Sequence, residues 1–147
     1  MATSPTPAPL LTLSDLDTLT SSNKYLILDF WAEWCPPCKA IAPLFTKLAA
    51  AHTIPNKLAF AKVDVDAAPD IAAKFGVTAM PTFLFLVDGE AKGIDVGAGV
   101  TGGGVVSPEK ADGLVMIRGA DPRNLVGAVE AIAALAKKEL EEKGETA

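Results

Sequence analysis

The stretch Tyr25-Leu-Ile-Leu-Asp-Phe-Trp-Ala-Glu-Trp-Cys-Pro-Pro-Cys-Lys39 decides the fold. Its first seven residues are apolar on both faces, which is typical of a central strand buried between two layers of helices. The residues after Lys39 carry an apolar stripe at helical spacing, Ile41, Leu44, Phe45 and Leu48, so we expect a helix there. Both cysteines of the chain therefore lie where a buried strand passes into a helix.

Two thiols in this position favour dithiol–disulfide chemistry. Cys35 stands at the start of the helix, where unpaired backbone N–H groups and the helix dipole stabilise a thiolate. Cys38 lies one turn further along and can attack a mixed disulfide formed by the first thiol. Half of a zinc site or an inert buried pair are the alternatives. A zinc site needs two more ligands, and the single histidine, His52, cannot complete it.

The remaining chain alternates strand and helix signals, which predicts an α/β fold with a three-layer, mixed sheet. We expect a short edge strand at 10–13 and a first helix that starts at Ser14 and covers 15–19. The later elements are expected as follows: strands at 58–65, 81–87 and 114–118, a short helix at 66–75, a hairpin turn at Asp88-Gly89, and a last helix capped by Asp121 that ends near Lys137-Lys138.

A glycine-rich insertion at about 91–112 interrupts the expected hairpin between the strand ending at 87 and the strand at 114–118. Long loops in compact domains are uncommon. Its composition leaves open whether it is a flexible linker or a partner-binding loop. We expect it to be rooted at the pole away from the cysteines, because the strand from Pro81 carries the chain roughly 20 Å at about 3.3 Å per residue. Val96-Gly97-Ala98 competes with 114–118 as the returning strand.

Composition limits the classes of function. The 147 residues suit one domain, which we expect at 10–138, between a flexible lead at 1–9 and a charged tail at 139–147. The net charge of −5 argues against a nucleic-acid surface. No apolar run is long enough to span a membrane, and the lead lacks the features of a targeting signal. We therefore expect a cytoplasmic monomer whose two cysteines are catalytic.

The segment Trp34-Cys35-Pro36-Pro37-Cys38-Lys39, preceded by Asp29-Phe30-Trp31-Ala32, closely resembles the active-site signature of thioredoxins. Thioredoxins usually have Gly-Pro between the cysteines, where this chain has Pro-Pro. Met80-Pro81-Thr82 matches the second mark of that family, a cis proline that opens a strand opposite the dithiol. The resemblance covers about residues 10–135, broken by the insertion, and it implies the thioredoxin fold.

The resemblance also implies roles for individual residues. Cys35 would be the exposed nucleophile and Cys38 the shielded thiol that resolves the mixed disulfide. Asp29 interrupts an apolar strand, and burial raises a carboxyl pKa; in the family the matching aspartate exchanges a proton with the second cysteine. Lys62 matches the buried partner of that aspartate, or is a surface lysine with a buried stem. The implied target groove consists of Trp34, Pro36, Pro37, Met80, Pro81, Gly119 and Ala120.

The implied function is that of a general protein disulfide reductase without a bound cofactor. Electrons would come from an external flavin- and NADPH-dependent thioredoxin reductase, and the targets would be proteins that carry disulfides. One alternative is an interaction module that holds a client with the groove and the insertion. Another is an oxidase or isomerase, which the lack of an export signal and of a histidine between the cysteines disfavours. We expect Pro36 to tune the reduction potential, because it removes one amide donor near the sulfur.

Overall fold

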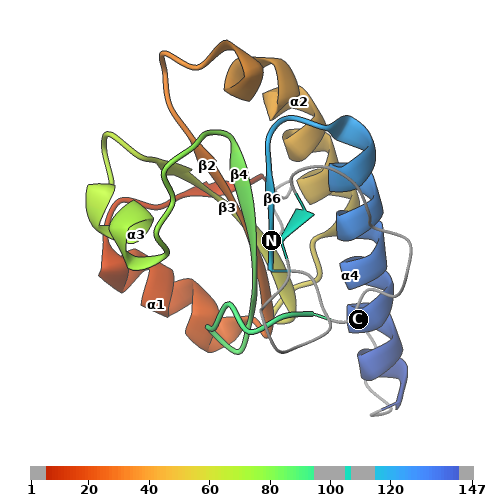
Figure 1. The fold of residues 1–147 in the computed structure, drawn as a ribbon. Helices are drawn as coiled ribbons and strands as arrows, with labels where there is room; N and C mark the ends of the chain where they lie inside the picture. Colours follow the sequence, from red (N-terminus) through yellow and green to blue (C-terminus); the bar gives the residue numbers. More distant parts are fainter. Residues whose placement is uncertain (1–5, 95–104, 107–114, 143–147) are drawn as a thin grey trace.

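The computed structural model describes residues 6–94, 105–106 and 115–142. Their strands form one mixed sheet in the order β1-β3-β2-β4-β6-β5. Helices α1 and α3 cover one face of the sheet, and α2 and α4 cover the other (Figure 1). The bounds are β1 Ala8–Pro9, α1 Leu13–Ser22, β2 Tyr25–Trp31, α2 Pro36–His52, β3 Leu58–Asp64, α3 Pro69–Lys74, β4 Thr82–Val87, β5 Val105–Val106, β6 Met116–Arg118 and α4 Pro122–Glu142. The predicted three-layer α/β architecture is confirmed.

Strand β2 is the centre of the sheet. It pairs with β3 in parallel along all seven residues and with β4 in antiparallel orientation. Tyr25 and Ile27 belong to the core under α2 and α4, whereas Leu26, Leu28 and Phe30 belong to the core under α1 and α3. This alternation follows from the two-residue period of a strand. Both faces are buried, as the continuous apolar run predicts.

Helix α2 is fixed to the sheet by aromatic packing. The ring of Phe45 lies 5.7 Å from that of Phe60 and 5.6 Å from that of Phe83, measured between centroids. Ile41 and Leu48 are buried on the same face of the helix. Burial of each such side chain stabilises the fold by about 1.5–3 kcal/mol. The packing therefore holds the start of α2, with both cysteines, at one end of the sheet.

Helix α4 extends beyond its predicted end. Asp121 caps it as expected, because its Oδ1 accepts hydrogen bonds from the backbone N–H groups of the next turn. The prediction that the helix stops near residue 138 and that a charged tail begins at 139 is wrong for residues 139–142, since α4 continues to Glu142. The carboxylate of Glu139 binds Lys24 Nζ at 3.1 Å, Lys57 Nζ at 2.8 Å and Tyr25 Oη at 2.8 Å. These contacts dock the last turns of α4 against the start of β2.

The N-terminal elements are shifted from their predicted positions. The edge strand is Ala8–Pro9 rather than 10–13. Helix α1 starts at Leu13, and its cap is Thr12 rather than Ser14. Thr12 Oγ1 accepts from the N–H of Asp15 at 3.0 Å, and Asp15 Oδ2 accepts from the N–H of Thr12 at 3.2 Å. This reciprocal capping box satisfies two donors at once, which a single serine cap does not do.

The hairpin turn after β4 forms as predicted. Asp88 and Gly89 both have positive φ, 54° and 79°, the conformation of a tight type I′ turn. The turn lies at the end of β4 remote from Pro81, so the chain leaves the sheet there at the pole away from the cysteines.

The returning strand is β6, which pairs with β4 and places Arg118 opposite Thr82. The expected strand at 114–118 is therefore confirmed, although it is shorter. Two residues of the predicted insertion form β5 on the outer side of β6. Its other parts from 95 onward, which include the competing segment 96–98, lie outside the described residues, as does the tail from 143.

Candidate active site

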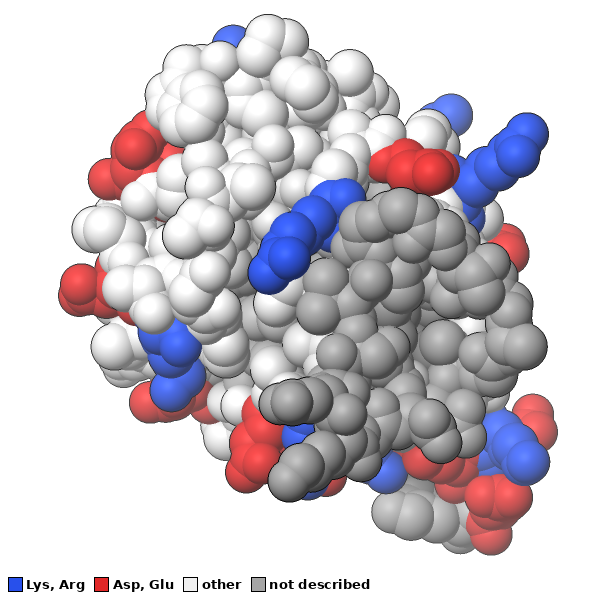
Figure 2. All heavy atoms as spheres, in the orientation of Figure 1, with Lys and Arg blue, Asp and Glu red and all other residues white. Residues whose placement is uncertain are grey.

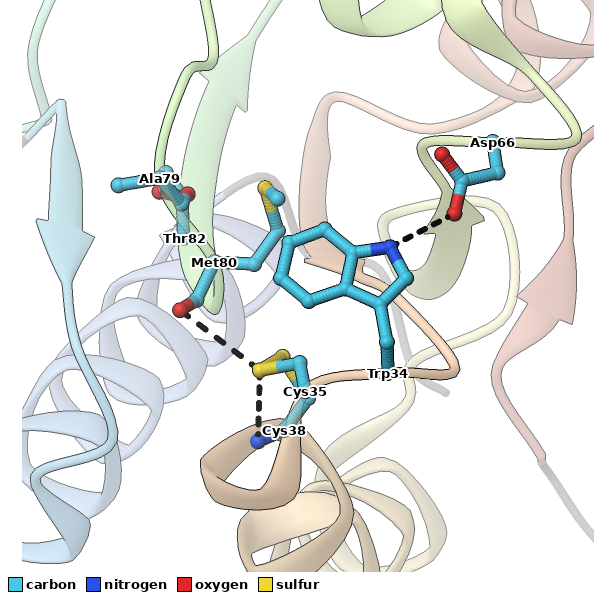
Figure 3. The surroundings of a disulfide bond; sticks show 7 residues. All are labelled: Trp34, Cys35, Cys38, Asp66, Ala79, Met80 and Thr82. Carbon is cyan, nitrogen blue, oxygen red and sulfur yellow. Dashed lines mark hydrogen bonds between the residues drawn. A yellow bond between two sulfur atoms is a disulfide. The ribbon is translucent and has the colours of Figure 1, made fainter.

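The two cysteines form a disulfide at the start of α2 (Figure 3). Cys35 is the N-cap residue with an extended backbone, and its Sγ accepts a hydrogen bond from the N–H of Cys38 at 3.2 Å. Pro36 and Pro37 occupy the first two helical positions and have no N–H. The N–H of Cys38 is thus the first amide of the helix that can reach the sulfur. A thiolate at Cys35 would be stabilised by this donor and by the helix dipole.

The expected contrast in exposure between the two cysteines is wrong for the disulfide form. Cys35 is 4% exposed and Cys38 is 2% exposed. Both pack against Ala32, with Trp31 and Met80 also in contact with this small cluster. The Cys35 Sγ lies 3.7 Å from the carbonyl oxygen of Met80. A disulfide sulfur has no proton to donate, so this is a contact without a hydrogen bond in the oxidised state.

The segment before β4 forms the wall opposite the disulfide. The peptide bond between Met80 and Pro81 is cis, and Thr82 Oγ1 donates to the carbonyl of Ala79 at 2.6 Å. The N–H of Gly119 donates to the carbonyl of Pro81 at 2.8 Å. Gly119 has φ +102°, a conformation that residues with a side chain rarely adopt. The structure thereby brings Gly119, and with it Ala120, to the same end of the sheet as the cysteines.

Trp34 is the most exposed large apolar side chain among the described residues, at 65%. Its Nε1 donates a hydrogen bond to Asp66 Oδ2 at 3.0 Å (Figure 3). Asp66 itself lies in a turn fixed by Asp64, whose Oδ1 accepts from the backbone N–H groups of Asp66 and Ala67. Because of this turn, α3 begins at Pro69 rather than at the predicted residue 66. The indole is therefore held beside the disulfide by an acidic side chain.

Asp66 is the residue of this site that the sequence analysis missed. It follows the end of β3, which runs parallel to β2. The ends of parallel neighbouring strands meet at one edge of a sheet, and β2 leads directly to the cysteines. The sequence signal for a residue near the cysteines was therefore an acidic residue directly after the next parallel strand.

Asp29 is buried under α2, as predicted. It is 1% exposed, and neither carboxylate oxygen has a hydrogen-bond partner among the described residues. Its odd position on β2 places it on the face covered by α2 and α4. Loss of water around the carboxylate raises its pKa from 3.8 to about 7, and the positive charge of Lys62 opposes part of that rise. A carboxyl group with this pKa can both accept and donate a proton near neutral pH.

Lys62 matches neither of its two predicted descriptions fully. It lies beside Asp29 in the register of β2 and β3, but within the described part of the chain no salt bridge joins the two. Its Nζ stands 4.8 Å from the centre of the Trp31 ring, a cation–π contact, and the residue is half-buried. Its charge therefore acts on the Asp29 carboxylate through space, without a direct pair.

No group of three or more His, Cys, Asp or Glu side chains in residues 6–94, 105–106 and 115–142 is arranged to hold a metal ion. Among the helices in those ranges, none combines the length and the apolar character needed to cross a bilayer. His52 lies at the far end of α2 from the cysteines.

The family model described as thioredoxin matches residues 11–103, which is more than half of the chain. The chain belongs to the thioredoxin family. The match ends before β6 and α4. The position of Gly119 near Pro81 is therefore given by the structure and not by the family model.

Relatives and solved structures agree with this assignment. A thioredoxin-like protein of Fusarium culmorum is 43% identical over 84% of this chain and 88% of its own length. A thioredoxin of Neurospora crassa is 40% identical over 82% and 81%. The crystal structure of Malassezia sympodialis thioredoxin superposes with a TM-score of 0.65 at 29% identity, covering 90% of this chain and 96% of that one. The oxidised mitochondrial thioredoxin 3 of Saccharomyces cerevisiae gives 0.62 at 34% identity, covering 84% and 93%.

Membership in this family defines the type of reaction. Thioredoxins are protein-disulfide oxidoreductases that need no prosthetic group. This chain carries the required pair, since its only two cysteines are bonded to each other at the start of α2. The thioredoxin reaction, reversible exchange between a dithiol and a target disulfide, is therefore the activity of this protein.

Proposed function

We propose that this thioredoxin acts as a general reductase of protein disulfides, with Cys35 as the attacking group. In the reduced protein the Cys35 thiolate attacks one sulfur of a target disulfide. The target S–S bond breaks, a mixed disulfide forms, and the released target thiolate takes up a proton. The observation that carries this assignment is the N–H of Cys38 directed at the Cys35 sulfur, a contact that stabilises the thiolate at that position.

Cys38 completes the reaction with the help of Asp29. The Cys38 thiol loses its proton to the Asp29 carboxylate, and its thiolate attacks the Cys35 sulfur of the mixed disulfide. The second target thiolate leaves, two electrons have passed to the target, and the Cys35–Cys38 disulfide remains. The burial of Asp29 without hydrogen-bond partners supports this role, because a pKa of about 7 suits a group that takes and returns a proton. The positive charge of Lys62 lowers the pKa of the Asp29 carboxyl group and so offsets part of the effect of burial.

Target proteins are proposed to lie across the rim formed by Trp34, Pro36, Pro37, Met80, Pro81, Gly119 and Ala120. The exposed indole and the Met80 side chain exclude water from the reacting sulfurs, and backbone groups next to Pro81 pair with an extended target segment. The position that a Cβ would occupy at Gly119 has no neighbouring atom within 4 Å, which supports this part of the proposal, since a target chain can approach the backbone closely there.

The electron donor, the compartment and the oligomeric state are also proposals. We propose regeneration by an NADPH-dependent thioredoxin reductase, because the dithiol is consumed in each turnover. The two cysteines of the chain both belong to the redox centre, which suits a reducing compartment such as the cytoplasm. A relative from Saccharomyces cerevisiae is named a mitochondrial thioredoxin. Location of the tagged chain in mitochondria would contradict the proposal of a cytoplasmic protein. Among the described residues only Leu11, Leu13 and Trp34 are large exposed apolar side chains, which favours a monomer.

An insulin-reduction assay with NADPH and thioredoxin reductase tests the reductase function. Wild-type protein is expected to reduce insulin catalytically, and Cys35→Ser to lose this activity. Cys38→Ser is expected to accumulate a mixed disulfide with the target, visible as a thiol-sensitive adduct by mass spectrometry. Equal activity of wild type and Cys35→Ser would contradict the proposal and favour the interaction module instead.

A further inference from the structure

The two arginines of this chain lie at one side of the proposed target rim. They are Arg118 and Arg123, the only arginines in the sequence, and they enclose Gly119 and Ala120. Arg118 ends β6, and Arg123 belongs to the first turn of α4. Both are exposed. A pair of permanent positive charges therefore brackets the two rim residues on this side.

The register of the sheet places Arg118 close to the reacting sulfurs. Arg118 lies opposite Thr82, and paired Cα atoms in antiparallel strands are about 5 Å apart. Thr82 is two residues from Met80, whose carbonyl oxygen lies 3.7 Å from the Cys35 sulfur. The backbone of Arg118 is thus within about 12 Å of Met80. Because Ile117 is buried under α2 and α4 and Met116 packs on the opposite face, the Arg118 side chain projects from the face of Met116, whereas Arg123 lies in the first turn of α4 on the other face.

Neither arginine forms a salt bridge within the part of the chain that the structure describes. The salt bridges found there join other residues. Asp121 lies between the two arginines in the sequence; its Oδ1 accepts from backbone N–H groups at the start of α4, and its carboxylate keeps its negative charge, so the three side chains together carry a net positive charge. Arg123 also borders a hollow of ≈490 Å³ between α2 and α4, together with the apolar Leu44, Pro122 and Val126 and the acidic Glu130. The hollow offers an apolar surface next to the positive charges.

The other side of the disulfide has the opposite charge. In Figure 3, Trp34 and Asp66 lie on one side of the cysteines, and Ala79, Met80 and Thr82 lie on the other. Asp66 is the acidic group in contact with Trp34 on this side of the rim, and Glu33 is paired with Lys39 at 3.3 Å. Most of the upper part of the face in Figure 2 is uncharged. The rim therefore has a carboxylate beside Trp34 and, beside Gly119 and Ala120, two arginines with one aspartate between them.

We infer that Arg118 and Arg123 select disulfide targets that carry acidic residues next to the attacked cysteine. This inference rests on the reductase function proposed above and names a substrate class for the same site. Acidic side chains of a bound target lie against the two guanidinium groups, and basic side chains at the same place are repelled. Two unit charges about 7 Å apart in water change binding by about threefold.

The test uses three disulfide peptides of the same length. The two residues on each side of the disulfide are Glu, Gln or Lys, and kcat/KM is measured for each peptide at low and high salt. We expect wild-type protein to prefer the Glu peptide over the Gln peptide by about tenfold at low salt, the Lys peptide to be reduced more slowly than either, and the Glu-to-Gln ratio to shrink at high salt as the charges are screened. Arg118→Gln and Arg123→Gln are each expected to lower the ratio about threefold, and the double variant to remove it.

A matched control separates this effect from net charge. Lys138→Gln removes the same charge from an exposed position near the far end of α4, and it is expected to keep the wild-type ratio. Equal reduction of the three peptides by wild-type protein would overturn the inference while the reductase function stands. A preference that survives in the double variant would overturn it as well. Failure to reduce any of the three peptides would contradict the reductase function itself.

Discussion

The buried carboxyl group of Asp29 makes the stability of this protein depend on pH in a defined direction. Its folded-state pKa of about 7 lies above its ordinary value of 3.8, so the folded protein holds a proton that the unfolded chain has released. The contribution of this proton to the free energy of unfolding is fully present below about pH 4 and is lost as the pH rises to about 7. One pKa unit corresponds to about 1.36 kcal/mol, so the loss between pH 4.5 and 8.5 is about 3 kcal/mol.

Asp29→Asn removes this titration, because the amide does not ionise. Guanidinium unfolding of the oxidised protein at pH 4.5 and pH 8.5 measures the effect, and the disulfide keeps thiol titration out of the comparison. The variant is expected to gain about 3 kcal/mol relative to wild type on going from the lower to the higher pH. Any fixed cost of burying the amide cancels in this difference. A wild-type-to-variant difference that is the same at both pH values would refute the reasoning.

Three further predictions follow from other contacts. Although burial raises the pKa of Glu139, hydrogen bonds from two lysines and a tyrosine lower it to about 2. Glu139→Gln is therefore expected to cost about 2 kcal/mol in guanidinium unfolding at pH 7, a loss that fades as the pH falls from 4.5 to 2; Glu142→Gln, at the exposed helix end, serves as control. Asp66→Ala releases the Trp34 indole, so KM for insulin should rise about fivefold, whereas Asp66→Asn, which keeps an acceptor, should stay near wild type. Pro36→Gly adds an amide near the attacking sulfur, which should raise the reduction potential by about 10–30 mV in a glutathione redox titration; an unchanged potential contradicts the tuning role.

The parts of the fold that local signals specify were predictable from the sequence. The apolar run at 25–31 indicated the central strand, and Asp121 followed by Pro122 indicated the start of the last helix. The helix cap near residue 12 was missed because Thr12 and Ser14 are both suitable caps, and only the reciprocal bond with Asp15 decides between them. Local signals of equal strength leave the boundary of an element undetermined.

Features that depend on distant contacts were not predictable in the same way. The last turns of α4 are held by Glu139, whose partners Lys24 and Tyr25 are more than a hundred residues earlier in the chain. The position of Asp66 beside Trp34 depends on the meeting of two strand ends. The low exposure of Cys35 follows from packing against the segment before β4. The cysteine pair and the proline opposite it were recognisable because their chemistry fixes both residue type and spacing.

The central claim is that the start of α2 makes Cys35 the reactive thiolate. The most direct test is the rate of iodoacetamide alkylation of the reduced protein as a function of pH, with the modified cysteine identified by peptide mapping. We predict that Cys35 reacts first, with a midpoint at least about one pH unit below the value of about 8.5 for free cysteine. Preferential modification of Cys38, or a Cys35 midpoint at the free-cysteine value, would contradict the account.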